Sequence, residues 1–242
     1  MRRAEREVSL MNEPSTQLVP NRERSFEHLI GSGSGAEQLL ETAQPFLELI
    51  MHNECALKEI ETKLNVLNDE FSLRHNYNPI ESIKTRVKDP LSIVEKMKRK
   101  GIPATIENME ERLNDIAGIR VICSFPEDIY VLAELLVRQD DITLIRKKDY
   151  IANPKPNGYR SLHLILGIPI FLSSGKRMMK VEAQFRTIAM DFWASLEHKM
   201  RYKQNIENAE DIARELQFCA EAINSIDYRM QDIRNRIEQS RE

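Results

Sequence analysis

Residues 114–136, NDIAGIRVICSFPEDIYVLAELL, constrain the fold more than any other stretch of this 242-residue chain. Apolar side chains alternate with other residues over 119–123, which predicts a β-strand, and an amphipathic helix follows at 126–136. A strand that leads directly into a helix is the beginning of an α/β layer. Further strands are predicted at about 141–146 and at 160–168.

The segment KVEAQFRT, at 180–187, predicts another strand, and its two faces differ. Successive side chains of a strand point to opposite sides of the sheet. The apolar face carries Val181, Ala183 and Phe185. The polar face carries Glu182, Gln184 and Arg186. A strand with three polar side chains on one face either is exposed to solvent or lines a site, and Thr187 is a good N-cap for the helix that follows.

The segment RVKDPLSIVEKMKRKG predicts a short helix with a cationic face. Asp89 is a favourable N-cap, Pro90 suits the first helical position and Gly101 ends the helix. One face carries Ser92, Lys96 and Arg99, and the opposite side carries Ile93, Val94 and Met97. Arg86 and Lys88 precede the N-terminus, where the helix dipole favours anions. A polyphosphate could bind along this face, although a solvated lysine-rich helix is the simpler interpretation of the segment taken alone.

The segment KDYIANPKPNGYRSLHLIL, at 148–166, contains a stiff turn between two strand-like runs. Its side chains include Lys148, Lys155, Tyr159, Arg160 and His163. Residues that bind ligands are often carried by loops on a rigid scaffold, so the turn is a candidate binding site. The alternative is a solvated turn whose tyrosine packs on the sheet.

Two carboxylates complete a possible reaction site. Glu182 lies on the polar face of its strand, and Asp115 stands just before the strand at 119–123. Two carboxylates can hold Mg²⁺ while leaving positions open for phosphate oxygens. Lysine and arginine side chains then neutralise the charge that develops on a polyphosphate. Together these features indicate metal-dependent phosphoryl-type transfer, although each of them is weak evidence alone.

The composition limits the class of protein and its location. With 35 basic against 38 acidic residues the chain is not a general nucleic-acid coat, so any anion site must be a local cluster and nothing indicates RNA binding. The three cysteines, Cys55, Cys123 and Cys219, have no metal-ligand spacing, which favours a reduced compartment. No apolar run approaches the roughly 20 residues that cross a bilayer, and the N-terminus lacks the core of a signal peptide. We expect a cytoplasmic protein without membrane contact, although the start codon could be Met1 or Met11.

The ends of the chain differ from its middle. Residues 1–36 are polar and end in a Gly-Ser run, which predicts a flexible tail. An apolar stripe with helical spacing runs through 37–75, and another runs through 204–242. The C-terminal stripe consists of Leu216, Ala220, Ile223, Ile226, Met230, Ile233 and Ile237. These long stripes exceed what one small sheet needs for cover, so we expect a homo-oligomer assembled through them.

Four motifs now point to a family. RVKD, DIAGIRV, KDYIANPKPNGYRSLH and VEAQFRT, in this order and spacing, resemble the synthetase domain of the RelA/SpoT family. The short chain and the stretch AMDFWASLEHK resemble the small alarmone synthetases within it. The similarity covers about 45–203. We assign 37–203 to the synthetase domain and 204–242 to a helical segment for oligomerisation. The expected fold is α/β, with a nucleotidyltransferase-like mixed sheet of about five strands flanked by helices and long helices at both ends.

The resemblance implies an activity. The chain contains no His-Asp dipeptide, so the hydrolase domain of the long family members is expected to be missing. The implied reaction is that of a GTP pyrophosphokinase of the stringent response, which transfers pyrophosphate from ATP to the 3′-hydroxyl of GDP or GTP. The products are ppGpp or pppGpp and AMP. The resemblance also makes a homotetramer the expected assembly.

The resemblance also implies residue roles. The ATP-binding residues would be Arg86, Lys88, Ser92, Lys96 and Arg99. The guanine-nucleotide-binding residues would be Arg120, Lys148, Lys155, Tyr159, His163 and Gln184, with Tyr159 stacked on the base. Asp115 and Glu182 would bind Mg²⁺, and Glu182 would also position or deprotonate the 3′-hydroxyl.

Some questions stay open on the sequence. Two other functions fit it: a pyrophosphokinase of the same family with another acceptor, such as an adenine nucleotide or a tRNA 3′ end, and a non-catalytic nucleotide- or RNA-binding module. The pair Asp115 and Glu182 argues against the second. Trp193 is expected in the core, Asp191 receives no role, and Glu197 and His198 either act near the metal or form a solvated face. The segment 146–149 does not reveal whether GDP or GTP is preferred.

Overall fold

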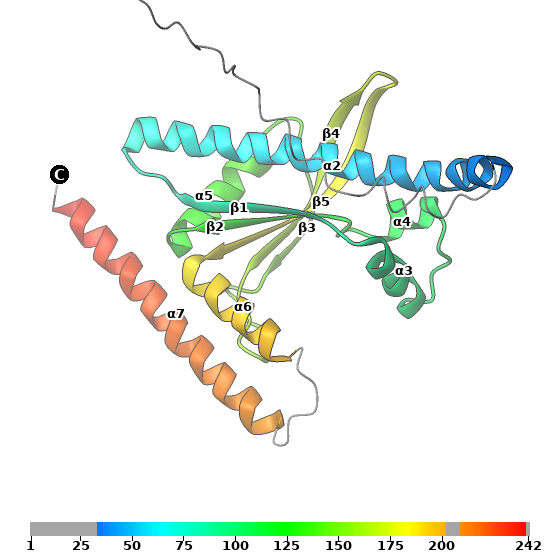
Figure 1. Ribbon diagram of the computed structural model, residues 1–242. Coiled ribbons are helices and arrows are strands. Elements are labelled where there is room, and N and C mark those ends of the chain that lie inside the picture. The colour runs from blue at the N-terminus through cyan, green and yellow to red at the C-terminus, as the bar shows by residue number, and fades with distance from the viewer. Residues whose placement is uncertain (1–32, 202–208, 241–242) are drawn as a thin grey trace, which may run out of the picture. The chain divides into compact units, whose positions relative to one another are not determined.

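The structure is a computed structural model that describes residues 33–201 and 209–240 (Figure 1). The chain divides into two compact units, 1–44 and 45–242, and of the first unit only the beginning of a helix is described. The helices are α2 (Gly33–His75), α3 (Pro90–Arg99), α4 (Ile106–Arg112), α5 (Pro126–Val137), α6 (Ile188–Arg201) and α7 (Ala209–Gln239). The strands are β1 (Ile80–Val87), β2 (Ala117–Cys123), β3 (Thr143–Asp149), β4 (Leu162–Leu172) and β5 (Gly175–Thr187). Within the described ranges no helix is long and apolar enough to cross a membrane.

The strands form one mixed sheet in the order β1-β2-β5-β4-β3, as expected for the fold class. The pair β2–β5 is parallel, and the other three pairs are antiparallel. Strands β3 and β4 lie a few residues later than predicted, and β4 with β5 forms a hairpin that extends past the other strands (Figure 1). The prediction of an α/β domain with a mixed five-stranded sheet flanked by helices is therefore confirmed.

Strand β1 was not located from the sequence. Ile80, Ile83 and Val87 pack only partly against the core, because β1 is at the edge of the sheet. The pairing with β2 shifts between Ile80 and Ser82, as in a β-bulge. A bulge interrupts the alternation of apolar and polar residues by which a strand is recognised.

Helices α2 and α5 pack on the apolar face of the sheet. Ile60 and Leu64 of α2 and Leu132 of α5 are fully buried there. The strand residues of this cluster include Ile119, Val121, Val181, Ala183, Phe185, Leu164 and Leu166. Helix α2 begins at Gly33, four residues before the predicted start, and residues 1–32 of the predicted tail lie outside the described ranges. With one face of the sheet covered by these helices, the polar residues occupy the other face.

Helix α3 has the caps that its sequence predicts. The side chain of Asp89 accepts hydrogen bonds from the backbone N–H groups of Leu91 and Ser92, and Gly101 follows the helix with φ of +66°. Of the three residues on the side opposite to the cationic face, Ile93 and Met97 are buried, whereas Val94 is 43% exposed. A ten-residue helix buries only the narrow line of residues that faces its neighbours.

Helix α7 packs on α6 and α5 of the same chain (Figure 1). Its inward residues, three and four apart, are Leu216, Ala220, Ile223, Asp227, Gln231 and Arg234. The inward face is therefore apolar in its first half and polar in its second. The predicted apolar stripe is only partly buried: its later members, Ile226, Met230, Ile233 and Ile237, are 46–59% exposed.

Candidate active site

The pairing of the strands places the polar residues in rows across one face of the sheet. Residues paired on adjacent strands point to the same side. One row contains Arg86, Gly118, Glu182, Ile165 and Arg146. The next row contains Lys84, Arg120, Gln184, His163 and Lys148. Five strands thus bring together on one surface several of the side chains that the sequence singled out.

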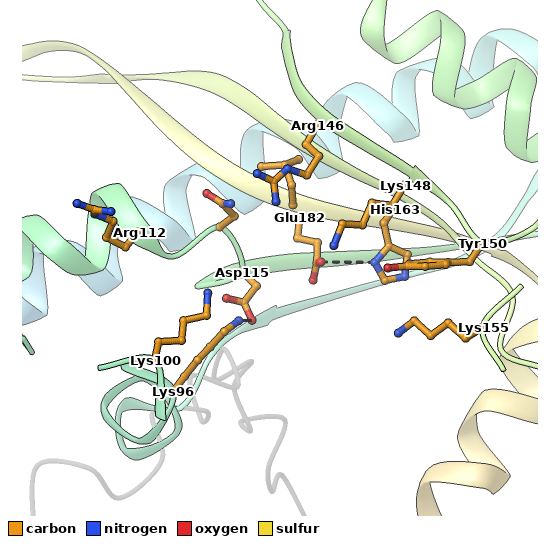
Figure 2. A pocket seen from close by; sticks show the side chains of 12 residues that line it. Lys96, Lys100, Arg112, Asp115, Arg146, Lys148, Tyr150, Lys155, His163 and Glu182 are labelled. Carbon is orange, nitrogen blue, oxygen red and sulfur yellow. Dashed lines mark hydrogen bonds and ion pairs between the residues drawn. The ribbon is translucent and has the colours of Figure 1, made fainter. Parts of the chain in front are cut away.

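A cavity of about 280 Å³ lies over this surface (Figure 2). Its lining consists of Lys96, Lys100, Arg112, Asn114, Asp115, Arg146, Lys148, Tyr150, Lys155, His163, Ile165 and Glu182. Six of these side chains are lysines or arginines and two are carboxylates, a composition suited to a highly anionic ligand. In Figure 2 Arg112 and Lys100 lie toward one end and Tyr150 and Lys155 toward the other, with Glu182 between them.

The cavity brings together some predicted site residues and not others. Those in its lining are Lys96, Asp115, Lys148, Lys155, His163 and Glu182. Those outside its lining are Arg86, Lys88, Ser92, Arg99, Arg120, Tyr159 and Gln184. Arg99 and Ser92 are exposed on α3. Tyr159 and Gln184 lie directly behind the lining, in contact with His163 and Glu182 respectively.

Several lining residues were missed from the sequence. Lys100 follows α3, and Arg112 ends α4, a helix that was not predicted. Asn114 precedes Asp115, and Tyr150 follows β3. The motif at 146–149 already contained Arg146, and the alternation of β3 could have revealed that Arg146 and Lys148 share a face.

Asp115 is held by two lysines, Lys88 just before α3 and Lys96 within α3. Lys88 Nζ and Lys96 Nζ both donate to Asp115 Oδ2, at 2.9 and 2.5 Å. Burial raises the pKa of Asp115, but the hydrogen bonds and charges of these lysines outweigh burial and keep it below its ordinary value. The other oxygen, Oδ1, is buried and has no hydrogen-bond partner in the described part of the chain. An ionised oxygen of this kind suits a metal ligand.

Glu182 is held at both of its oxygens. Gln184 Nε2 donates to Oε2 at 3.0 Å, and His163 Nδ1 lies 3.5 Å from Oε1. Burial raises the pKa of Glu182, and the charge of Asp115 adds to this, but His163 and Gln184 lower it by more, so the pKa is below the ordinary value. Glu182 is therefore ionised at neutral pH.

The two carboxylates fit a magnesium site of the type that is completed by substrate. The described residues contain no group of three or more His, Cys, Asp or Glu side chains that could hold a metal by themselves. Mg²⁺ in phosphoryl-transfer sites is typically bound by one or two carboxylates together with phosphate oxygens. The free oxygen of Asp115 and the carboxylate of Glu182 meet that requirement.

Tyr159 lies at the centre of a packed polar cluster. Its hydroxyl oxygen is 2.8 Å from His163 Nε2 and accepts a hydrogen bond of 2.8 Å from Arg186 Nη2. Lys155 Nζ lies 4.7 Å from the centre of the Tyr159 ring and 4.8 Å from that of Tyr150. The aromatic ring is thus surrounded by cations.

Helix α7 fixes the turn that carries Tyr159. Gly158 has φ of +85°, and a Cβ atom there would lie 2.5 Å from the Cβ of Ala220 on α7. Only glycine fits this backbone conformation and this close approach. Asn157 Nδ2 also donates to Glu197 of α6 at 3.1 Å, and Trp193 is buried, as predicted. Glu197 and His198 are outside the cavity lining.

The comparisons with known proteins identify the family. The signature described as "Region found in RelA / SpoT proteins" matches residues 85–207. The chain belongs to the RelA/SpoT family. It is 45% identical over 191 residues to "GTP pyrophosphokinase YwaC" of Bacillus subtilis, covering 79% of this chain and 90% of that protein. To "GTP pyrophosphokinase YjbM" of the same organism it is 38% identical over 186 residues, with 76% and 86% covered.

Solved structures agree with this assignment. The crystal structure of small alarmone synthetase 1 from Bacillus subtilis bound to its product pppGpp matches with a TM-score of 0.72 and 35% identity, over 81% of this chain and 99% of that one. The RelA/SpoT region contains every predicted site residue of this chain, while α7 lies beyond it. The contacts of α7 with the Tyr159 turn are therefore an addition to the matched region.

Proposed function

We propose that this RelA/SpoT chain is a GTP pyrophosphokinase that transfers pyrophosphate from ATP to the 3′-hydroxyl of GDP or GTP. The observation that carries the proposal is the pair of carboxylates, Asp115 and Glu182, in a cavity that also contains six cationic side chains. A module that only bound nucleotides would gain little from two carboxylates beside phosphates, which they repel in the absence of a metal. The names of the similar proteins, both GTP pyrophosphokinases, support the same reaction.

ATP is proposed to bind on the side of the cavity formed by α3. The residues that bind it would be Arg86, Lys88, Ser92, Lys96 and Arg99. Lys88 and Lys96 share one oxygen of Asp115, so they stand next to the proposed metal ligand. Mg²⁺, when bound by Asp115 and Glu182, would neutralise phosphate charge and orient the β-phosphate. Arg99 and Ser92 are exposed and would contact the nucleotide from the open side.

The guanine nucleotide is proposed to bind on the side of β3 and β4. Tyr159 would stack on the base, and Lys148 and Lys155 would bind its phosphates. Arg120, His163 and Gln184 would complete the surroundings of the acceptor. Glu182 would accept the proton of the 3′-hydroxyl, which turns that oxygen into the nucleophile that attacks the β-phosphorus of ATP while AMP leaves.

One experiment tests the reaction and its acceptor together. The protein is incubated with ATP, Mg²⁺ and, in turn, GDP, GTP, ADP or a tRNA, and the products are separated. We expect AMP together with ppGpp or pppGpp, and loss of both when EDTA removes the metal. If product formed with ADP or tRNA but not with GDP or GTP, the chain would be a pyrophosphokinase with another acceptor. If no AMP formed with any of the four acceptors, the chain would be a non-catalytic module.

We further propose that the protein self-associates, as a homotetramer, in the cytoplasm where its substrates occur. The exposed stripe of Ile226, Met230, Ile233 and Ile237 on α7 supports an interface between copies. In sedimentation at micromolar concentration we expect the parent to be a tetramer and Met230→Lys to be smaller. Phe171→Lys, at an exposed apolar residue of β4, is the matched control. A monomeric parent would contradict the proposal.

A further inference from the structure

Arg186 is a buried cation that none of the roles above includes. Its side chain is only 6% exposed, although it lies on the polar face of β5. Nη2 donates to the hydroxyl of Tyr159 at 2.8 Å and to Oε1 of Gln184 at 3.2 Å. Nη1 donates to Oδ1 of Asp191 at 2.9 Å. A buried guanidinium requires such partners, and two of them, Tyr159 and Gln184, belong to the proposed acceptor site.

Two routes of hydrogen-bonded side chains lead from Arg186 to Glu182. The first runs through Gln184, whose amide nitrogen donates to Glu182 Oε2 at 3.0 Å. The second runs through Tyr159 and His163, the latter 3.5 Å from Glu182 Oε1. The two routes close a ring that holds both oxygens of the carboxylate.

Arg186 also sets the direction of the hydrogen bonds in this ring. A guanidinium has only donors, so the Tyr159 oxygen and the Gln184 carbonyl oxygen must accept from it. When the imidazole of His163 has its proton on Nδ1, toward the acceptor-only carboxylate of Glu182, its Nε2 accepts the hydroxyl proton of Tyr159. Likewise the amide nitrogen of Gln184 is turned toward Glu182. One cation therefore orients the stacking ring, the imidazole and the carboxylate together.

Asp191, in the first turn of α6, holds this cation in place. Its Oδ1 accepts from Arg186 at 2.9 Å and from Arg120 at 3.2 Å, and its Oδ2 lies 3.8 Å from Lys84 Nζ. Burial and the neighbouring charge of Arg186 lower the pKa of Arg120, while Asp191 opposes this shift. Without Asp191, two partly buried guanidinium groups on adjacent strands would repel each other across the acceptor site.

We propose that Arg186 and Asp191 are positioning residues for the acceptor: Arg186 orients Tyr159, His163 and Glu182, and Asp191 holds Arg186 where it can do so. Neither residue lines the cavity, and Arg186 reaches the site through the side chains of Tyr159 and Gln184, so the proposed role of the pair is positioning and not catalysis. The inference rests on the proposed function, because it is measured through the acceptor nucleotide. It predicts a selective defect: binding of the acceptor and turnover should fall, and binding of ATP should not.

The first test separates the two substrates. Arg186→Gln should raise the KM for GDP about tenfold, because a hydrogen bond to a charged group contributes about 1.5–3 kcal/mol. It should lower kcat and leave the KM for ATP within about twofold. Arg186→Lys keeps the positive charge but cannot donate from two terminal nitrogens at once, so its KM for GDP should lie between those of the parent and Arg186→Gln. Asp191→Asn should change the KM for GDP in the same direction by less. Asp211→Asn and Arg214→Gln, from an exposed ion pair on α7, are the matched controls.

The second test asks whether Asp191 acts through Arg186. In a double-mutant cycle, Asp191→Asn should add less than about twofold to the KM for GDP once Arg186 is glutamine. Multiplicative effects would overturn the coupling. If Arg186→Gln loses its cooperative melting transition, Arg186→Lys and Asp191→Asn decide instead, and an unchanged KM for GDP in both overturns the proposal. Failure of the proposed function looks different, since the parent itself would then form no product from GDP or GTP.

Discussion

The two sides of the cavity are built in different ways. The proposed ATP side comes from one short stretch, residues 86–115, which contains the end of β1, helix α3 and Asp115. The proposed acceptor side is assembled from β2, β3, β4, β5 and a turn that rests on α7. A binding surface made by one helix can be recognised in a sequence, whereas one made by five elements appears only after folding.

The two sides also differ in how their charges are arranged. On the ATP side, Lys88 and Lys96 are paired with one carboxylate oxygen and the helix face beyond them is open to solvent. These pairs can exchange partners when phosphates arrive. On the acceptor side, Arg186 is buried and bonded at both terminal nitrogens. We infer that the acceptor side is preorganised and that the ATP side rearranges on binding.

Glu182 is the one residue on which both sides depend, and its replacement should have the largest effect. Glu182→Gln keeps the size of the side chain and removes the charge that would bind Mg²⁺ and accept the 3′-hydroxyl proton. Loss of a general base alone costs about 10²–10⁴-fold in rate. We expect AMP release from ATP and GDP to fall at least that far, while the melting temperature and GDP affinity change little. A variant that folds and retains turnover within a few-fold of the parent would falsify the catalytic role.

Tyr159 tests the acceptor side alone. Tyr159→Ala should weaken GDP binding about tenfold to a hundredfold, because stacking of a base on an aromatic ring contributes about 1–3 kcal/mol. ATP binding should be unchanged. Tyr159→Phe keeps the ring but loses the contacts to His163 and Arg186, so it should bind GDP less tightly than the parent, as Arg186→Gln does, but more tightly than Tyr159→Ala, and it should turn over slowly. Equal losses for ATP and GDP in Tyr159→Ala would mean that the tyrosine only packs against Trp193 and α7.

The features that the sequence predicts, and those that it does not, follow the same division between the two sides. The helix α3 was predicted with its caps, because its N-cap, proline and glycine signals all lie close together, within 89–101. The polar face of β5 followed from simple alternation. The burial of Arg186 and the partners of Asp191 could not be predicted, because they depend on helix α6 folding back over β2 and β5. The apolar stripe of α7 was predicted, but not that its second half is exposed. There the buried face is formed by Asp227, Gln231 and Arg234, whose polar partners lie about 40 to 157 residues away in the chain.

Lys96 tests the ATP side, and its effect should be smaller. A hydrogen bond to a charged partner contributes about 1.5 kcal/mol at the low end of its range, so Lys96→Met should raise the KM for ATP about tenfold. Lys88 still pairs with Asp115, so the carboxylate stays ionised and the fold is kept. The KM for GDP should stay within about twofold. Lys98→Met, at an exposed position of the same helix, is the matched control. If Lys96→Met raised both KM values equally, the two sides would not be separate.

Asp227 tests the support of the acceptor side, with the smallest expected effect. Asp227 lies on the inward face of α7, where its carboxylate is buried and accepts a hydrogen bond of 2.6 Å from Thr187, the cap of α6. Burial raises the pKa of Asp227, and the bond from Thr187 offsets this only in part. In the folded state Asp227 therefore keeps its proton to a higher pH than the ordinary Asp pKa of about 3.9. The stability of the parent falls as the pH rises from that ordinary value through the raised pKa of Asp227.

Asn at position 227 can keep the bond from Thr187 and does not titrate. The melting temperature of Asp227→Asn minus that of the parent should therefore increase as the pH rises above about 4 and then level off. Asp232→Asn, at an exposed position of the same helix, should show no such trend. A difference that shrinks with rising pH would mean that the folded state prefers the ionised carboxylate. In that case a charged carboxylate would hold α7 to the acceptor side, just as the charged carboxylate of Asp115 holds Lys88 and Lys96 on the ATP side. The contrast in how the two sides arrange their charges would then not extend to this contact.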